Sequence, residues 1–196
     1  LVVVNVPRAR AGELVARTRD AGLPLDASAF WRGTVACTGL EFCKLAITET
    51  KSYAARLVEE LEARLPGYDR HVRINVNGCP NSCGQHWIAD IGLQGCKIKA
   101  PGQAQPADGF EFLVGGAMGR QSGLARRINF RCPAGQVAAS IESLLRGYQQ
   151  ERFEFETFRE YCARVGDDRL VSLLSGEAVP LVPQPHASSA ASGAYC

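Results

Sequence analysis

Two short stretches, ACTGLEFC (Ala36–Cys43) and NGCPNSCG (Asn77–Gly84), decide how this chain is interpreted. Each stretch holds one pair of cysteines, so that the candidate thiols are Cys37, Cys43, Cys79 and Cys83. Four thiols brought together from two pairs can hold an iron–sulfur cluster. The pattern therefore favours a metallocofactor site where the two stretches meet.

Composition limits the class of protein. The 196 residues, 46% hydrophobic and 21% charged, are typical of one globular domain with part of a second. Lys+Arg 22 against Asp+Glu 20 gives no whole-chain attraction to nucleic acid, and the apolar run Leu1–Val6 is too short to span a membrane. Eight cysteines in a chain without signs of secretion indicate metal-binding thiols in the reducing cytoplasm. Because the chain starts at Leu1, we expect a fragment whose parent continues upstream.

Periodicity predicts a fold that combines strands and helices, α+β or α/β. The expected strands are Leu1–Val6, Thr34–Cys37, His71–Val76, Ile88–Ile98 and Phe110–Val114. We expect helices from Pro7 to about Gly22, from Gly39 to Leu65, from Pro133 onward, and over Phe155–Leu174 with a break around Gly166. The turn-rich Pro101–Gly109 is expected to be an exposed loop.

The first cysteine pair lies where the longest expected helix begins. Thr38 and Glu41 have capping-box spacing, and an apolar stripe follows them until Pro66-Gly67. Cys37 and Cys43 would then lie near the positive end of the helix dipole, which favours thiolates and an anionic cluster.

The second pair lies in a loop after an expected strand. Pro80 stiffens this loop, while Gly78 and Gly84 leave room for close approach of a flat, bulky group. Spacing alone leaves two other interpretations open, a structural zinc site and a disulfide or buried inert thiols.

The sequence around the thiols adds a resemblance. ACTGLEFCKLAITETK (Ala36–Lys51) and NVNGCPNSCGQHWIADIGLQG (Asn75–Gly95) closely resemble the sirohaem and iron–sulfur dependent nitrite and sulfite reductases. The similarity continues through FLVGG (Phe112–Gly116) to about Leu174. It implies a mixed sheet flanked by helices, with a [4Fe–4S] cluster and sirohaem as cofactors. The implied cluster ligands are Cys37, Cys43, Cys79 and Cys83, of which Cys83 would also be the axial ligand of the sirohaem iron.

The resemblance also implies a domain organisation. Residues 1–23 would be the end of a ferredoxin-like half-domain, 24–175 the 4Fe-4S/sirohaem-binding domain, and 176–196 a disordered tail. The cationic side chains that hold the substrate anion in this family come mainly from the upstream half. The catalytic residues are therefore unknown here, and we expect this piece to be inactive alone.

The implied activity is the six-electron reduction of nitrite to ammonia, with ferredoxin as donor. SCGQ (Ser82–Gln85) resembles the nitrite branch, and an assimilatory sulfite reductase is the alternative. A non-catalytic iron–sulfur electron relay is the alternative from another class.

Other residues were weighed against simpler roles. The resemblance implies that Gly115 and Gly116 lie near the cofactor, because the family has its matching glycines there. His86 follows the second pair closely and is a candidate proton donor, whereas His71 is expected to be a surface residue. We expect Cys96, Cys132 and Cys162 to be structural thiols. A basic group is expected to form a solvated face or to contact sirohaem carboxylates or ferredoxin; it comprises Lys97, Lys99, Arg120, Arg126, Arg127 and Arg131.

Overall fold

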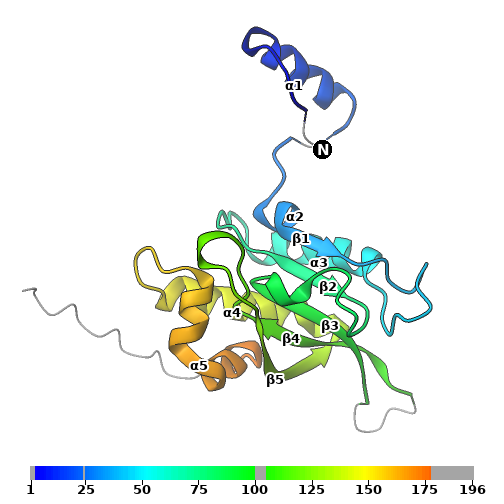
Figure 1. Cartoon of the computed structure of the whole chain (residues 1–196), viewed down its shortest axis with the longest axis vertical. Helices are drawn as coiled ribbons and strands as arrows, with labels where there is room; N and C mark the ends of the chain where they lie inside the picture. Colours follow the sequence, from blue (N-terminus) through cyan, green and yellow to red (C-terminus); the bar gives the residue numbers. More distant parts are fainter. Residues whose placement is uncertain (1–2, 24, 100–104, 178–196) are drawn as a thin grey trace, which may run out of the picture.

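The computed structural model describes residues 3–23, 25–99 and 105–177. Its centre is a five-stranded sheet in the order β1-β2-β3-β4-β5 (Figure 1). The strands are β1 (Thr34–Ala36), β2 (Ile74–Asn77), β3 (Ile91–Ile98), β4 (Ala107–Val114) and β5 (Arg126–Pro133). The pairs β1–β2 and β2–β3 are parallel, whereas β3–β4 and β4–β5 are antiparallel. The mixed sheet flanked by helices that the sequence predicts is confirmed.

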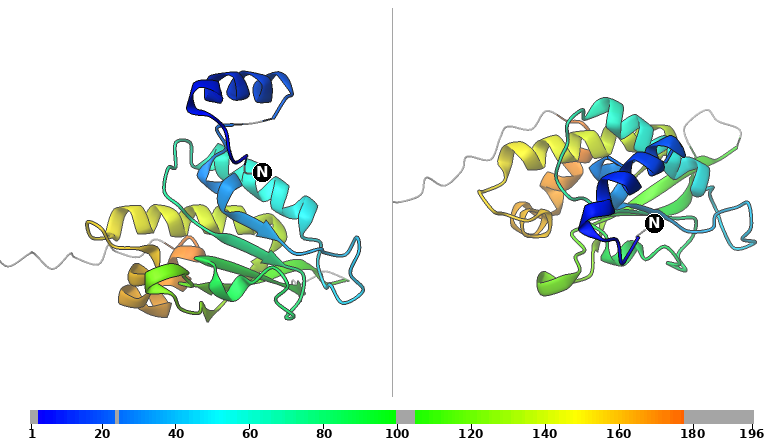
Figure 2. Two further views of the ribbon diagram at one scale, coloured as in Figure 1. Left: turned by 45° about the horizontal axis from the view of Figure 1, so that its top comes forward. Right: turned by 90° about the horizontal axis from the view of Figure 1, so that it is seen from above.

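Helices cover one face of this sheet. The elements are α2 (Ala29–Gly33), α3 (Lys51–Arg64), α4 (Val137–Glu151) and α5 (Phe158–Leu174). Figure 2 shows α3 and α4 side by side across the strands, and α5 packs against α4 and β5. The helix predicted from Pro133 onward is confirmed as α4, and four apolar residues on one of its faces are fully buried: Val137, Ile141, Leu144 and Leu145. None of the described helices combines the length and the apolar character needed to cross a lipid bilayer.

The break predicted in the last helix is also confirmed. Gly166 has φ 76°, a conformation that interrupts α5 and that glycine adopts without strain. Beyond the break, Arg169 forms a buried ion pair with Glu151 at the end of α4, and the Tyr161 hydroxyl donates to the same carboxylate at 2.9 Å. These bonds fix the bent helix against α4.

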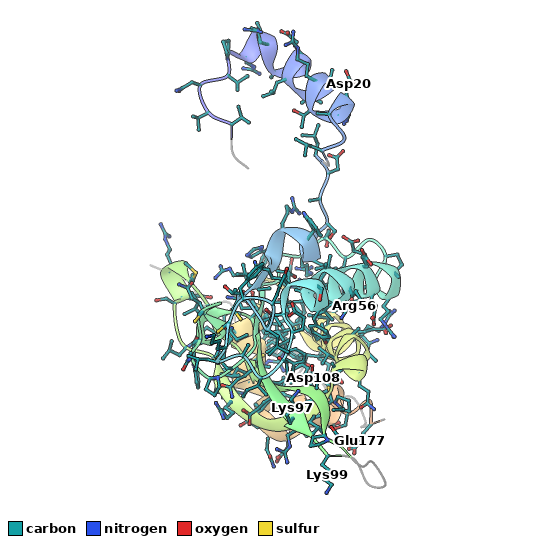
Figure 3. All side chains as sticks on the ribbon, turned by 90° about the vertical axis from the view of Figure 1, so that its right-hand side faces the viewer. Asp20, Arg56, Lys97, Lys99, Asp108 and Glu177 are labelled. Carbon is teal, nitrogen blue, oxygen red and sulfur yellow. The ribbon has the colours of Figure 1, made fainter. Side chains whose placement is uncertain are left out.

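The N-terminal helix stands apart from the sheet. α1 (Ala11–Asp20) follows a short 3-10 turn, η1 (Arg8–Arg10), and none of its residues is buried. Figures 1 and 3 show this helix, labelled at Asp20 in Figure 3, projecting from the rest of the molecule. The helix predicted after Pro7 is confirmed. The strand predicted at Leu1–Val6 is wrong for its described part, because residues 3–6 form no strand.

The helix predicted to start at Gly39 is wrong in its first half. α3 begins only at Lys51 and has 14 residues, and residues 37–50 form an irregular loop. Phe42 is 73% exposed and Leu45 67%, so the apolar stripe assigned to them has no core to bury against. The loop's backbone amides instead find partners elsewhere in the fold, which outweighs the local capping-box pattern.

The sheet extends further than the sequence predicts. β5 was not predicted, although Arg126–Pro133 alternates between exposed and buried positions over much of its length. β4 starts at Ala107, inside the segment predicted to be a loop. Residues 100–104, where the predicted loop begins, and all but the first two residues of the tail predicted at 176–196 lie outside the described residues.

Candidate metal centre

The two cysteine stretches follow neighbouring parallel strands. Cys37 comes directly after β1 and Cys79 follows the last residue of β2 by two positions. Parallel strands end at the same edge of a sheet, so both stretches emerge there, as Figure 2 shows. Cys37 also continues the strand pairing, because its N–H donates to the carbonyl of Val76 at 3.0 Å.

Hydrogen bonds also join the loop of residues 37–50, which carries Cys37 and Cys43, to Gly78 of the second stretch. Its carbonyl accepts from the N–H of Ile47 at 2.7 Å and of Thr48 at 3.3 Å. Its own N–H donates to the Sγ of Cys37 at 3.2 Å. The loop that carries Cys37 and Cys43 therefore lies against the residue that precedes Cys79.

Three glycines make this contact possible. A Cβ on Gly78 would lie 2.8 Å from the carbonyl oxygen of Thr48, and one on Gly95 would lie 2.2 Å from Thr48 Oγ1. A Cβ on Gly84 would lie 3.1 Å from the backbone nitrogen of Cys37. The sequence suggested that Gly78 and Gly84 make room for a flat group. In the structure these glycines leave room for the opposite loop, and Gly84 brings the residue after Cys83 next to Cys37.

Two asparagines of β2 hold the segment after Cys83. Asn77 Oδ1 accepts from the N–H of Gly84 at 2.6 Å, and Asn75 Nδ2 donates to the carbonyl of Gln85 at 3.0 Å. This support is needed because Gln85 has φ 56°, in the left-handed region that side chains rarely adopt. Sequence analysis missed both asparagines. Their alternate spacing in a buried strand just before a cysteine motif was the available signal.

Thr50 is a third residue that the sequence did not single out. It is fully buried, and its hydroxyl donates to the Cys37 carbonyl at 2.7 Å and lies 3.6 Å from Cys37 Sγ. Thr50 is also the N-cap of α3, so Cys37 lies beside a helix N-terminus after all. The predicted stabilisation of a thiolate by a helix dipole therefore applies to Cys37, which the fold brings beside the start of α3. It was predicted for Cys43 because that residue was placed on the same helix, and Cys43 is not on it.

The four motif thiols differ in exposure. Cys79 is buried, Cys37 and Cys43 are partly exposed, and Cys83 is exposed. All seven described cysteines are free thiols, so no disulfide links the two stretches. In the described part of the chain, no three His, Cys, Asp or Glu side chains are close enough to hold one metal ion. A four-iron cluster does not need such a point of convergence, because each thiolate binds its own iron.

His86 directly follows Gln85, the last residue of the segment that the two asparagines hold. Its side chain is fully buried, and neither ring nitrogen makes a well-formed hydrogen bond with the described residues. Burial lowers the pKa of His86, and the Gln94 amide, near the ring but outside hydrogen-bond geometry, only partly opposes this. The imidazole is therefore held in its neutral form. His71, in contrast, is exposed, as expected.

The glycine pair after β4 packs against the protein itself. A Cβ on Gly116 would lie 2.4 Å from the carbonyl oxygen of Ala89, and one on Gly115 would lie 3.3 Å from the Cβ of Cys162. Gly115 also has φ 77°. These contacts account for glycine at both positions without a cofactor, so the cofactor role of Gly115 and Gly116 stays a prediction.

The remaining thiols have a different character. Burial raises the pKa of Cys132 to about 11 and also raises the pKa values of Cys96 and Cys162. Raised pKa values disfavour the thiolate that binds metals. These three cysteines therefore have the environment expected of structural thiols.

Half of the basic group is already paired. Arg126 bonds Asp167 at 2.6 Å and the Cys162 carbonyl at 2.6 Å, and Arg127 bonds Glu111 at 2.8 Å. Lys97 pairs with Asp108 on the β3–β4 hairpin, where Figure 3 labels both. The other members make no ion pair with the described residues: Lys99, Arg120 and Arg131.

Known proteins are similar to most of this chain. Residues 27–180 match the family described as the nitrite and sulphite reductase 4Fe-4S domain. A sulfite reductase [ferredoxin] of Mycolicibacterium paratuberculosis is 36% identical over 175 residues, 87% of this chain and 31% of that protein. An assimilatory ferredoxin-dependent nitrite reductase of Haloferax mediterranei is 35% identical over 169 residues, 85% of this chain and 28% of that protein.

A solved structure is similar as well. The NirA protein of Mycobacterium tuberculosis superposes with a TM-score of 0.77 at 34% identity, covering 85% of this chain and 31% of that one. This chain thus spans about three-tenths of the length of the relatives it matches.

Proposed function

The chain belongs to the nitrite and sulphite reductase 4Fe-4S family, and from this premise we propose that it is the cofactor-binding part of a ferredoxin-dependent nitrite reductase. Membership of the family implies a [4Fe–4S] cluster and sirohaem. The observation that carries the proposal is the meeting of the two cysteine stretches at Gly78, whose N–H donates to Cys37 Sγ at 3.2 Å.

The donor set fits the cluster. Cys37, Cys43, Cys79 and Cys83 would hold it, since soft thiolates are the ligands that iron–sulfur clusters take. Cys83 would also bind the sirohaem iron, and its exposed position at the rim of the site supports this. When bound, the two cofactors supply one-electron transfer and the iron at which the substrate anion is reduced.

The chain's own residues orient these ligands. Gly78 donates to one sulfur, Thr50 fixes the carbonyl of Cys37, and the two asparagines hold the backbone after Cys83. Hydrogen bonds of this kind orient metal ligands and tune the metal they bind. Because this chain spans only part of its relatives' length, we expect the side chains that bind the substrate anion to come from the rest of the enzyme.

Nitrite is proposed as substrate from the sequence SCGQ (Ser82–Gln85) after the second cysteine pair. Sulfite is the second candidate, because the relatives include proteins named sulfite reductase as well as nitrite reductase. Comparison of kcat/KM for the two anions, with reduced ferredoxin as donor and the full-length enzyme, separates them.

The cofactor assignment is tested with serine variants of the full-length protein. Cys43→Ser and Cys83→Ser should lower iron and acid-labile sulfide content, and Cys83→Ser should also change the sirohaem absorption bands. Cys96→Ser is the matched control, another partly exposed thiol that should leave all these signals unchanged. Full cluster content in both motif variants would refute the ligand assignment. Cluster absorption without sirohaem bands in the unaltered protein would favour an electron relay.

A further inference from the structure

Of the two polar atoms in the side-chain amide of Asn77, one makes a hydrogen bond and the other makes none among the described residues. Asn77 is the last residue of β2 and is 1% exposed. Its Oδ1 accepts the N–H of Gly84 at 2.6 Å, which fixes the orientation of the amide. Its Nδ2 is buried and has no hydrogen-bond partner among the described residues.

The free amide group belongs to the second cysteine stretch and lies close to the backbone of Cys37 in the first. The position of a Cβ on Gly84 is 3.2 Å from Asn77 Nδ2 and 3.1 Å from the backbone nitrogen of Cys37. Gly84 itself is bonded to Cys83 in the chain. Asn77 Nδ2 is thus a buried donor close to Gly84, the residue that follows Cys83, and near the backbone of Cys37.

A buried NH₂ group without an acceptor is rare in native proteins, because it loses its hydrogen bonds to water and gains none in return. The neighbouring Asn75 differs in kind, since its unpartnered atom is Oδ1, which can only accept. Of the two asparagines in β2, only Asn77 therefore offers a hydrogen-bond donor that needs an acceptor from outside the described protein.

We infer that Asn77 donates from Nδ2 to a sulfur atom of the iron–sulfur centre and thereby raises the reduction potential of that centre. The inference rests on the proposed function, because it requires the four motif cysteines to bind an iron–sulfur cluster. Adding an electron increases the negative charge on the sulfurs, so a donor aimed at sulfur stabilises the reduced form more than the oxidised form. Asn77 is a positioning and tuning residue in this account, and no bond is made or broken at it.

Asn77→Asp tests the inference directly. Aspartate has the same shape and retains an oxygen that can accept the Gly84 N–H, but it replaces the Nδ2 donor with an acceptor. Asn129→Asp is the matched control, because Asn129 is an exposed residue on β5 of the same sheet. Each full-length protein is analysed for iron and acid-labile sulfide, and the midpoint potential of the cluster is measured by redox titration followed by electron paramagnetic resonance.

We expect Asn77→Asp to bind the cluster and to show an about tenfold lower ratio of reduced to oxidised cluster at a fixed solution potential. For a one-electron couple this corresponds to a shift of about 59 mV to more negative potential. Asn129→Asp should have the potential of the unaltered protein. Equal potentials in all three proteins would overturn the inference.

A second pair of variants covers the case in which Asn77→Asp does not retain the cluster. Asn77→Thr and Asn77→Val have nearly the same shape, and only threonine carries a hydroxyl that can donate. The threonine variant should have the higher potential, and equal potentials would refute the donor role. If the unaltered protein binds no iron or sulfide, the proposed function and this inference both fail. A cluster-containing protein with an unshifted Asn77→Asp variant refutes this inference alone.

Discussion

Thr50→Val isolates the contribution of one hydroxyl to the architecture of the cysteine loop. Thr50 is fully buried, and its hydroxyl donates to the Cys37 carbonyl at 2.7 Å. Valine has nearly the same shape as threonine but no hydroxyl, so the change leaves the Cys37 carbonyl without this hydrogen bond. Loss of a buried hydrogen-bond partner costs about 1–3 kcal/mol. Thr50→Ser retains the hydroxyl and loses one methyl group, which costs about 0.8 kcal/mol.

The two variants therefore have a defined order of stability. The free energy of unfolding should fall further in Thr50→Val than in Thr50→Ser, although valine is the more apolar side chain. The measurement is the denaturant-induced unfolding of the metal-free protein that carries this segment, monitored by circular dichroism. The role assigned to this hydroxyl would be refuted if Thr50→Val were as stable as the unaltered protein, or if Thr50→Ser were less stable than Thr50→Val.

Two further predictions concern the support of the site. Gly95→Ala should destabilise the protein by about 1–3 kcal/mol and reduce its cluster content, because the new Cβ would lie 2.2 Å from Thr48 Oγ1. Gly135→Ala is the control for this change, since a Cβ there meets nothing within 4 Å. Because burial lowers the pKa of His86, the unfolded chain binds the proton first as the pH falls below about 6.5, and stability declines from there. His86→Phe should reduce the decline between about pH 6.5 and 5.5 seen in unfolding experiments, whereas a substitution at exposed His71 should retain it.

An element could be predicted from the sequence where the apolar residues that repeat at its period are the residues that the fold buries. The stripe of α4 is one example, because Ile141 and Leu144 meet the core that the helical period requires. The loop before α3 shows the opposite case. Thr38 and Glu41 are spaced as a capping box, but Gly39 has φ 74°. The amides of Ile47 and Thr48 bond Gly78, which is 31 and 30 residues further along the chain. A local pattern cannot report such distant partners.

The candidate site was predicted through its cysteines and the resemblance that surrounds them. The residues that hold those cysteines were not predicted. Threonine is ordinary at a helix start, whereas two asparagines at alternate positions of an apolar strand were a signal that was not used. Thr50 and Asn77 become notable only when the fold shows that they are buried beside Cys37 and Gly84. Thr50 contacts Cys37 across the irregular loop before α3, and Asn77 contacts Gly84 across the turn that carries the second cysteine pair. The backbone path of these loops creates both contacts, and sequence spacing alone does not predict that path.

Two of the four motif cysteines, one from each stretch, are held more firmly by the fold than the other two. Cys37 is fixed by Val76, Gly78 and Thr50, and Cys79 is buried. Cys43 lies in the loop that exposes Phe42, and Cys83 is itself exposed. Where a metal site is incompletely formed beforehand, part of the free energy of metal binding is spent on ordering the ligands. Binding of a cluster should therefore order Cys43 and Cys83 most, while the sheet edge at Cys37 and Cys79 serves as the rigid side of the site.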